Sequence, residues 1–277
     1  MKRALSLLPF AALIVATSCE GPAAILSTVT PPSSTPTGRL IWADEFDGAA
    51  GTSPSATRWA FDVGTDWGNA QLEYDTARPT NVSLDGGGNL AIVARRESYL
   101  GSAYTSGRIK TQGFYSQNRG RFEARMKLPT GRGMWPAFWL LGSDIGSVGW
   151  PTCGEIDVME YRGQEPGVVH GSLHGPGYSG ATPETAVFNL PGGATFADGF
   201  HLFSVEWEPG VVRFFVDDIL YQTRTPADLP PGAPWVFDHP FFLLLNVAVG
   251  GNWPGSPDGS SPFPQRMLVD YVRVYSR

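Results

Sequence analysis

Cysteine is almost absent from this chain of 277 residues, in which Cys19 and Cys153 are the only two. Two cysteines cannot form the framework of cross-links that holds a small disulfide-rich domain together, so that class of protein is excluded. No plausible base motif lies beside Cys153. We therefore expect Cys153 to be a buried structural cysteine rather than a reactive thiol.

Long hydrophobic runs and clusters of basic residues are also missing. The apolar run at residues 4–15 is shorter than the ~20 residues that a membrane-spanning helix needs. The chain has 20 Lys and Arg against 26 Asp and Glu, and its net charge is −6. An acidic chain without Lys/Arg clusters is a poor candidate for binding nucleic acid or anionic lipid headgroups. We expect no nucleic-acid partner, and contact with a membrane only through a lipid anchor.

The first 18 residues have the pattern of an export signal. Lys2 and Arg3 precede the apolar run, and the small residues 16–18 precede Cys19. An ordinary cleaved signal peptide fits this pattern. The position of Cys19 favours a bacterial lipoprotein signal, in which this cysteine becomes the acylated N-terminus. Both alternatives predict an exported protein, either secreted or held at the cell surface as a lipoprotein.

Residues 19–38 and 39–277 differ in composition. The first segment is rich in Ser, Thr and Pro and carries almost no bulky side chains, so it predicts an extended tether rather than a packed unit. The second segment is long enough for one large domain with a sizeable core. It contains no internal repeat that would divide it.

Helical periodicity is lacking as well, whereas 34 Gly and 24 Pro punctuate the chain at short intervals. Between them lie short runs that alternate between apolar and polar residues, as in residues 121–127, where Phe122, Ala124 and Met126 alternate with charged residues. Other predicted strands lie at residues 89–94, 202–207, 211–216, 241–249 and 268–275. Many short strands separated by turn signals predict an all-β sandwich or jelly roll.

The run at residues 241–249 is nearly continuously apolar and predicts a strand that is covered on both faces. Asn246 carries the only amide side chain in this run. Because a buried amide must be hydrogen-bonded, Asn246 either ties down a loop or faces a polar cleft.

Three carboxylates occur within six residues of the stretch CGEIDVME, at Glu155, Asp157 and Glu160. Side chains of a regular strand alternate between its faces, so Glu160 should point away from the other two. A β-bulge adds one residue and shifts the alternation by one. A bulge at Val158 and Met159 would bring all three carboxylates to one face.

Such an arrangement fits acid/base chemistry. With the bulge, Glu155 and Glu160 are four strand steps apart, or ~13 Å between Cα atoms. Side chains that lean toward each other would bring the carboxyl groups to roughly 5 to 6 Å, the separation in retaining glycosidases. Three clustered carboxylates cannot all ionise easily, so at least one pKa should rise. A solvated strand face or a calcium site remains the alternative, although calcium ligands usually come from loops.

These residues resemble glycoside hydrolase family 16. Residues 154–160 match its E-x-D-x-x-E signature, in the bulged form of the laminarinase-like (endo-β-1,3-glucanase) branch rather than the E-x-D-x-E form of lichenases. Further similar segments are residues 42–47 (WADEFD), 104–111 (YTSGRIKT), 120–125 (GRFEAR), 133–142 (GMWPAFWLLG), 174–180 (HGPGYSG) and 250–255 (GGNWPG). The resemblance covers essentially all of residues 39–277 and identifies this segment as a catalytic domain.

The resemblance implies a concanavalin A-like β-jelly-roll sandwich with a concave cleft for a β-glucan. It also implies endo-hydrolysis of β-1,3-glucan with retention, in which Glu155 is the nucleophile, Glu160 the acid/base and Asp157 the assisting carboxylate. A glycanase for mixed-linkage β-1,3-1,4-glucan, or another family 16 glycanase, is the alternative, followed by a non-catalytic β-glucan-binding protein. The substrate-binding residues that the resemblance or their position suggests are Asn69, Arg108, Trp135, Trp139, Trp150, His170, His174 and Trp253.

The resemblance further implies a structural calcium ion on the convex side, held by Glu45, the Gly88 carbonyl and Asp270. The reaction itself would need no cofactor. We expect the protein to act as a monomer whose partner is the polysaccharide.

Overall fold

The computed structural model describes residues 38–277. The predicted export signal, Cys19 and the tether up to residue 37 lie outside this range. Residues 38–277 contain no helix that is both long and apolar enough to cross a membrane.

The described residues form two β-sheets. The ten-stranded sheet has the order β15-β14-β13-β8-β17-β5-β6-β3, with β1 beside β17 and β4 beside β5. Its strands are β1 (Leu40–Asp44), β3 (Glu73–Asp75), β4 (Val82–Leu84), β5 (Leu90–Tyr99), β6 (Ser102–Ser106), β8 (Gly120–Lys127), β13 (His201–Glu208), β14 (Val211–Val216), β15 (Ile219–Arg224) and β17 (Gln265–Tyr275).

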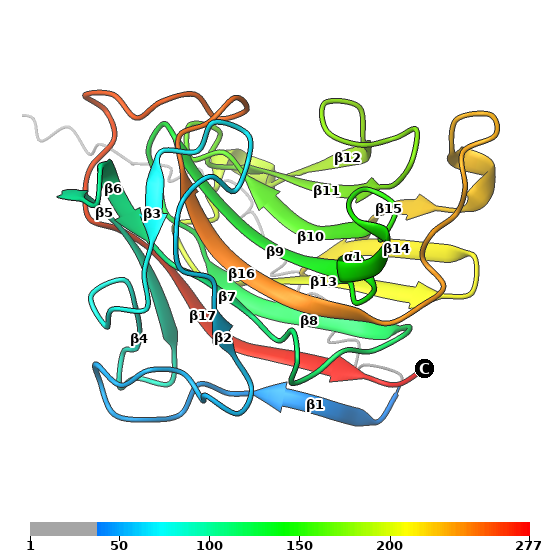
Figure 1. Cartoon of the computed structure of the whole chain (residues 1–277), viewed down its shortest axis with the longest axis horizontal. Helices are drawn as coiled ribbons and strands as arrows, with labels where there is room; N and C mark the ends of the chain where they lie inside the picture. Colours follow the sequence, from blue (N-terminus) through cyan, green and yellow to red (C-terminus); the bar gives the residue numbers. More distant parts are fainter. Residues whose placement is uncertain (1–37) are drawn as a thin grey trace, which may run out of the picture. The chain divides into compact units, whose positions relative to one another are not determined.

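The seven-stranded sheet has the order β12-β11-β10-β9-β16-β7-β2. Its strands are β2 (Ala60–Phe61), β7 (Arg108–Lys110), β9 (Met134–Gly142), β10 (Glu155–Tyr161), β11 (Val168–His174), β12 (Glu184–Asn189) and β16 (Phe241–Val249). Three short helical turns connect strands: α1 (Ile145–Val148), η1 (Pro191–Gly193) and η2 (Pro226–Asp228). Curved strands β9, β10 and β16 run side by side in Figure 1.

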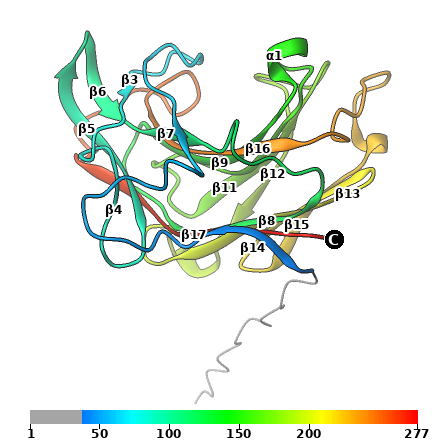
Figure 2. The same ribbon diagram turned by 60° about the horizontal axis from the view of Figure 1, so that its bottom comes forward.

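The two sheets stack face to face, with β9 and β16 in one layer and β8 and β17 in the other (Figure 2). Alternating side chains of both sheets fill the space between them; Phe122 and Ala124 of β8 are fully buried there, as are Phe138 of β9 and Leu245 of β16. Burial of this apolar surface is the main force that holds the layers together. The predicted all-β jelly-roll sandwich is confirmed.

Strand β16 is buried at every position, which confirms the prediction from its continuous apolar run. One of its faces belongs to the core between the sheets. The opposite face carries Phe242 and Leu244, which form a second apolar cluster with Leu141 and Cys153. Burial raises the pKa of the Cys153 thiol to about 11. The thiol therefore stays protonated at neutral pH, in agreement with a structural role.

A buried ion network fastens the outward face of strand β8. The Arg121 side chain is only 4% exposed, and its Nε donates to Glu123 Oε2 at 2.8 Å. Its NH groups reach Asp218 Oδ1 at 2.7 Å and Glu206 Oε1 at 3.4 Å. Glu123 is as deeply buried as Arg121. Loss of the guanidinium would leave the Glu123 carboxylate buried without its counter-ion.

We therefore expect Arg121→Met to lower the free energy of unfolding by about 3–5 kcal/mol, measured by chemical denaturation. The double variant Arg121→Met/Glu123→Leu should regain most of this loss, because it removes both buried charges. The matched control is Arg125→Met on the same strand. Its side chain is 42% exposed and pairs with Asp270, so the cost should stay below ~1 kcal/mol. Equal effects of the two single variants would contradict the assignment.

Candidate active site

Three carboxylates of strand β10 share one face of the seven-stranded sheet. Glu155, Asp157 and Glu160 each pair with a residue of β9. Those partners are two residues apart along β9: Leu141, Trp139 and Ala137. Residues two apart on a strand share a face, so the three acids do as well. Glu155 and Glu160 thus lie four steps apart on the neighbouring strand, as predicted.

The predicted bulge at Val158 and Met159 produces this arrangement. Met159 pairs with Phe138, whereas Val158 has no partner on β9. Both side chains are at most 1% exposed and belong to the core between the sheets. Two consecutive residues therefore point inward, and the alternation resumes with Glu160 on the outer face.

Strand β11 places two histidines beside the acids. The β11 residues opposite Glu155, Asp157 and Glu160 are His174, Ser172 and His170. The His174 Nε2 atom lies 3.1 Å from Asp157 Oδ2 and 3.9 Å from Glu155 Oε1. His174 is therefore close enough to stabilise negative charge on either carboxylate.

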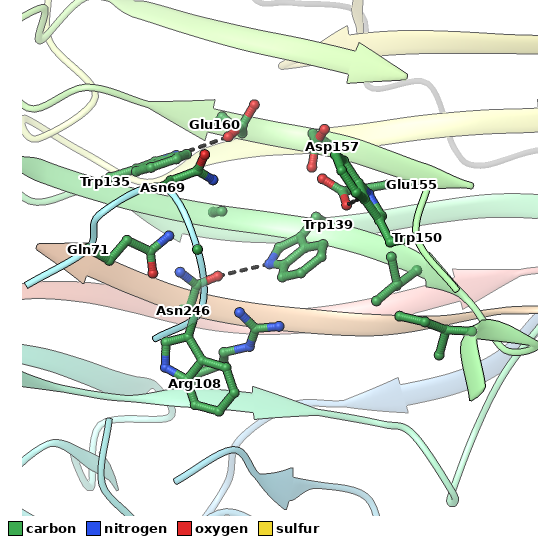
Figure 3. A pocket seen from close by; sticks show the side chains of 15 residues that line it. Asn69, Gln71, Arg108, Trp135, Trp139, Trp150, Glu155, Asp157, Glu160 and Asn246 are labelled. Atoms are coloured by element: carbon green, nitrogen blue, oxygen red, sulfur yellow. Dashed lines mark hydrogen bonds between the residues drawn. The ribbon is translucent and has the colours of Figure 1, made fainter. Parts of the chain in front are cut away.

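Two indole N–H groups hold the outer acids (Figure 3). Trp135 Nε1 donates to Glu160 Oε1 at 2.9 Å, and Trp150 Nε1 donates to Glu155 Oε2 at 2.8 Å. Each bond fixes the orientation of a carboxylate and favours its ionised form. Two of the tryptophans predicted to bind substrate thus also position the acids.

Burial and mutual repulsion raise the pKa values of all three acids. Burial raises the pKa of Glu155 to about 8, with a further contribution from Asp157. Burial likewise raises the pKa of Glu160 to about 7, although His174 and the Trp135 N–H oppose the shift. The pKa of Asp157 also rises, through burial and the charge of Glu160. The cluster therefore retains protons at neutral pH, as predicted for crowded carboxylates.

The acids lie at a cleft of about 440 Å³. Its lining is supplied by β7, β9, β10, β16, the segment between β9 and β10, and the segment between β2 and β3. The lining residues are Trp67, Gly68, Asn69, Gln71, Arg108, Trp135, Ala137, Trp139, Leu141, Ile145, Trp150, Glu155, Asp157, Glu160 and Asn246. Five of the eight residues predicted to bind substrate are among them: Asn69, Arg108, Trp135, Trp139 and Trp150.

Trp253 and His170 do not line this cleft but lie beside its Glu160 end. The Trp253 ring centroid is 5.3 Å from that of Trp135 and 4.9 Å from that of His170. The Arg162 guanidinium lies 4.9 Å from the Trp253 ring. Trp253 therefore packs against Trp135, which donates a hydrogen bond to the Glu160 carboxylate.

Arg108 lies between two rings on the other side of the cleft. Its guanidinium carbon is 4.8 Å from the Trp67 centroid and 4.9 Å from the Trp139 centroid. Its Nε donates to Asp62 Oδ2 at 3.0 Å. Trp139 Nε1 donates to Asn246 Oδ1 at 2.8 Å. Asn246 therefore faces the cleft, which settles the two alternatives that its position in β16 left open.

The lining residues that sequence reasoning missed are Trp67, Gly68, Gln71, Ala137, Leu141 and Ile145. Trp67 and Gln71 flank Asn69 in the stretch WGNAQLEY, so their proximity to a predicted binding residue was the available signal. Ile145 is the first residue of the helical turn α1, and no neighbouring residue in the sequence is predicted to bind substrate.

The two carboxylates among the predicted calcium ligands, Glu45 and Asp270, pair with arginines in this structure. Both oxygens of Glu45 accept hydrogen bonds from Arg273, at 2.9 and 2.8 Å. Asp270 accepts one from Arg125 at 2.5 Å. Carboxylates engaged in this way do not fit calcium without rearranging, and the calcium site stays a prediction.

Another group of side chains could hold a cation. Within residues 38–277, only Glu155, Asp157 and His174 form a group of three or more acidic, His or Cys side chains whose ligand atoms all lie within 4.8 Å.

Most of the chain is similar to known glycoside hydrolases. The model of glycosyl hydrolases family 16 matches residues 62–273. A beta-glucanase from Rhodothermus marinus is 44% identical over 248 residues, which cover 85% of this chain and 84% of that protein. This chain belongs to glycosyl hydrolase family 16, and the resemblance stated above is confirmed.

The similar solved structures include a laminarinase and an endo-β-1,3-glucanase. The laminarinase catalytic domain from Thermotoga maritima superposes with a TM-score of 0.81 at 45% identity, covering 87% of this chain and 98% of that one. The endo-β-1,3-glucanase from Pyrococcus furiosus gives a TM-score of 0.81 at 46% identity, covering 86% and 94%.

The raised pKa of Glu160 predicts a stability cost. The folded protein binds this proton up to about pH 7, whereas an ordinary glutamate loses it near pH 4.5. The folded state thus binds more protons in this window, and stability falls as the pH rises through it. We expect Glu160→Gln to unfold a few °C above the wild type at pH 8, for a gain on the order of 1–3 kcal/mol. At pH 4 this gain should vanish.

Scanning calorimetry at both pH values measures this difference. The control is Glu184→Gln at a partly exposed position of strand β12, outside the carboxylate cluster, whose effect should change little between the two pH values. A stability gain of Glu160→Gln that is independent of pH would contradict the electrostatic cause.

Proposed function

We propose that this protein is a retaining endo-β-1,3-glucanase that hydrolyses laminarin-like chains. The observation that carries the proposal is the bulge of β10, which lines up Glu155, Asp157 and Glu160 in one cleft. The names of the relatives, a beta-glucanase, a laminarinase and an endo-β-1,3-glucanase, support β-1,3-glucan as substrate. The Trp150 side chain, exposed although aromatic, is suited to stacking on a sugar ring.

The reaction proceeds in two displacements at one anomeric carbon. In the first, the Glu155 carboxylate attacks this carbon, the bond to the leaving oxygen breaks, and Glu160 gives that oxygen its proton. In the second, Glu160 takes a proton from water, the water oxygen attacks the same carbon, and the ester bond to Glu155 breaks. Two inversions give net retention. No cofactor takes part in either step.

The protonation states follow from the contacts. Repulsion by Asp157 contributes to the raised pKa of Glu155, and one shared proton removes this repulsion. With that proton on Asp157, Glu155 is ionised, and the Trp150 N–H holds its charge. Glu160, whose pKa is about 7, is protonated below neutral pH and meets the need for a general acid.

Laminarin tests the activity directly. The wild type should release reducing ends, and proton NMR during the first turnovers should show the β anomer. Glu160→Gln should lower kcat by roughly 10²–10⁴-fold, the usual contribution of general acid–base catalysis, and Glu155→Gln should lower it at least as much. Both variants should still bind the glucan, because the tryptophans of the cleft are intact.

The same assay on lichenan separates the alternatives. Faster cleavage of lichenan than of laminarin would favour the mixed-linkage enzyme, and binding without cleavage of either would favour the glucan-binding protein. Azide separates the two glutamate roles: with Glu155→Ala it should give an α-glycosyl azide, and with Glu160→Ala a β-glycosyl azide. The opposite pairing would reverse the assignment.

We also infer an exported, monomeric enzyme with a lipid at Cys19. The support is the basic start, the apolar run and the small residues before Cys19. Residues 19–38 would then hold the catalytic domain away from the membrane.

Metabolic labelling with palmitate should mark the full-length protein and leave Cys19→Ala unlabelled. Cys153→Ala is the matched control and should be labelled like the wild type. Absence of label from the wild type, together with release into the medium, would indicate an ordinary cleaved signal peptide.

A further inference from the structure

A second pair of buried acids lies behind one wall of the cleft and has no part in the mechanism above. Glu73 and Asp75 are two residues apart on strand β3, so their side chains share a face. Each residue is only 1% exposed. The Asp75 Oδ1 atom is buried and has no hydrogen-bond partner among residues 38–277. A buried carboxylate with an unpaired oxygen is costly as an anion.

The charges around this pair balance only if the pair keeps one proton. The charge of Arg108 acts on both acids, and the charge of Asp62 acts on Asp75. Lys110 pairs with Asp62 at 2.6 Å. Two cations against Asp62 and one further anion sum to zero, so a fully ionised pair would leave one excess buried negative charge. The neighbouring strands add no charge: β6 places Tyr104 and Ser106 beside the pair, and β16 contributes the Val249 backbone.

Burial shifts both acids in the direction that this balance requires. It raises the pKa of Glu73 to about 7. The pKa of Asp75 also rises, first through burial and then through repulsion by Glu73. The pair therefore holds a proton at neutral pH and loses it under alkaline conditions.

Glu73 ties the wall of the cleft to the end of strand β16. Its Oε2 accepts a hydrogen bond from the Val249 N–H at 2.7 Å. The neighbouring Leu72 N–H donates to the Val249 carbonyl at 2.9 Å. The Asn252 N–H donates to the Asn69 carbonyl at 2.7 Å, which links the wall to the loop that carries Trp253.

Asp75 closes the same segment at its other end. Its backbone N–H and carbonyl form two hydrogen bonds with Gly64, at 2.7 and 3.0 Å. The enclosed residues include the cleft-lining Trp67, Asn69 and Gln71. Trp67 also packs on the Arg108 guanidinium, which acts on both acids. The pair thus lies beside both the backbone hydrogen bonds that hold this segment and the Arg108 charge.

We propose that Glu73 and Asp75 share one proton and act as a positioning pair for the substrate-binding wall formed by Trp67, Asn69, Gln71 and Arg108. Loss of that proton places a second anion in a buried site, pulls Arg108 away from the rings of Trp67 and Trp139, and loosens the wall. Substrate binding then weakens while the chemical step, which takes place at β10, is unaffected. This inference rests on the proposed glucanase function.

Steady-state kinetics on laminarin between pH 6 and pH 9 tests the pair. We expect KM of the wild type to rise several-fold over this range. Asp75→Asn should remove the rise, because Glu73 is then the only acid left in the pair and no second buried anion can form as the pH rises. Glu73→Gln should do the same, since the amide oxygen still accepts from Val249. The pH profile of kcat, which reports the acids of β10, should keep its shape in both variants.

Asp66→Asn is the matched control, because it makes the same charge change on the same segment at an exposed position. It should retain the alkaline rise of KM. A rise that persists in both Asp75→Asn and Glu73→Gln, or a wild-type KM that does not change with pH, would overturn the proposal. If one variant does not fold, the other still decides.

Failure of the two proposals can be told apart. A wild type that cleaves no glucan refutes the glucanase function, whereas an active wild type with unchanged variants refutes only the positioning pair. Laminarin binding followed by tryptophan fluorescence at pH 6 and pH 9 tests the pair without catalysis, with the same expected loss of pH dependence in the variants.

Discussion

The active site depends on one extra residue in strand β10. Val158 and Met159 both enter the core between the sheets, and their burial is the reason that Glu160 returns to the face of Glu155 and Asp157. The apolar side chains thus set the geometry of the charged ones. The arrangement is rigid because β9, which pairs with β10, also pairs with β16 through nine residue pairs, and these strands form the floor of the cleft. Side chains on such a packed floor keep their positions better than side chains on loops.

Burial that fixes the acids also makes their charges costly. The pKa values of Glu155 and Glu160 rise to about 8 and about 7, and this upward shift both supplies a general acid near neutral pH and destabilises the fold above it. Indole N–H groups from Trp135 and Trp150 offset part of the cost. Function and stability are therefore opposed at this strand, a common feature of active sites.

Glu73 and Asp75 form a second cluster of buried acids, and there an arginine offsets part of the charge. Glu73 and Asp75 are buried beside Arg108 without a full complement of hydrogen bonds. Apart from Arg108 of β7, the wall is formed by the segment between β2 and β3, and its shape depends on a few backbone hydrogen bonds and on the balance of buried charge.

Local patterns in the sequence determined several of the strands, an all-β sandwich or jelly roll, and the bulge, because alternation along a strand is a property of neighbouring residues. Only the tertiary structure decided that Arg108 lies between Trp67 and Trp139, that Asn246 faces the cleft, and that Trp253 lies beside the cleft rather than in it. Those contacts join residues far apart in the chain. They depend on sheet order and packing, which no local pattern encodes.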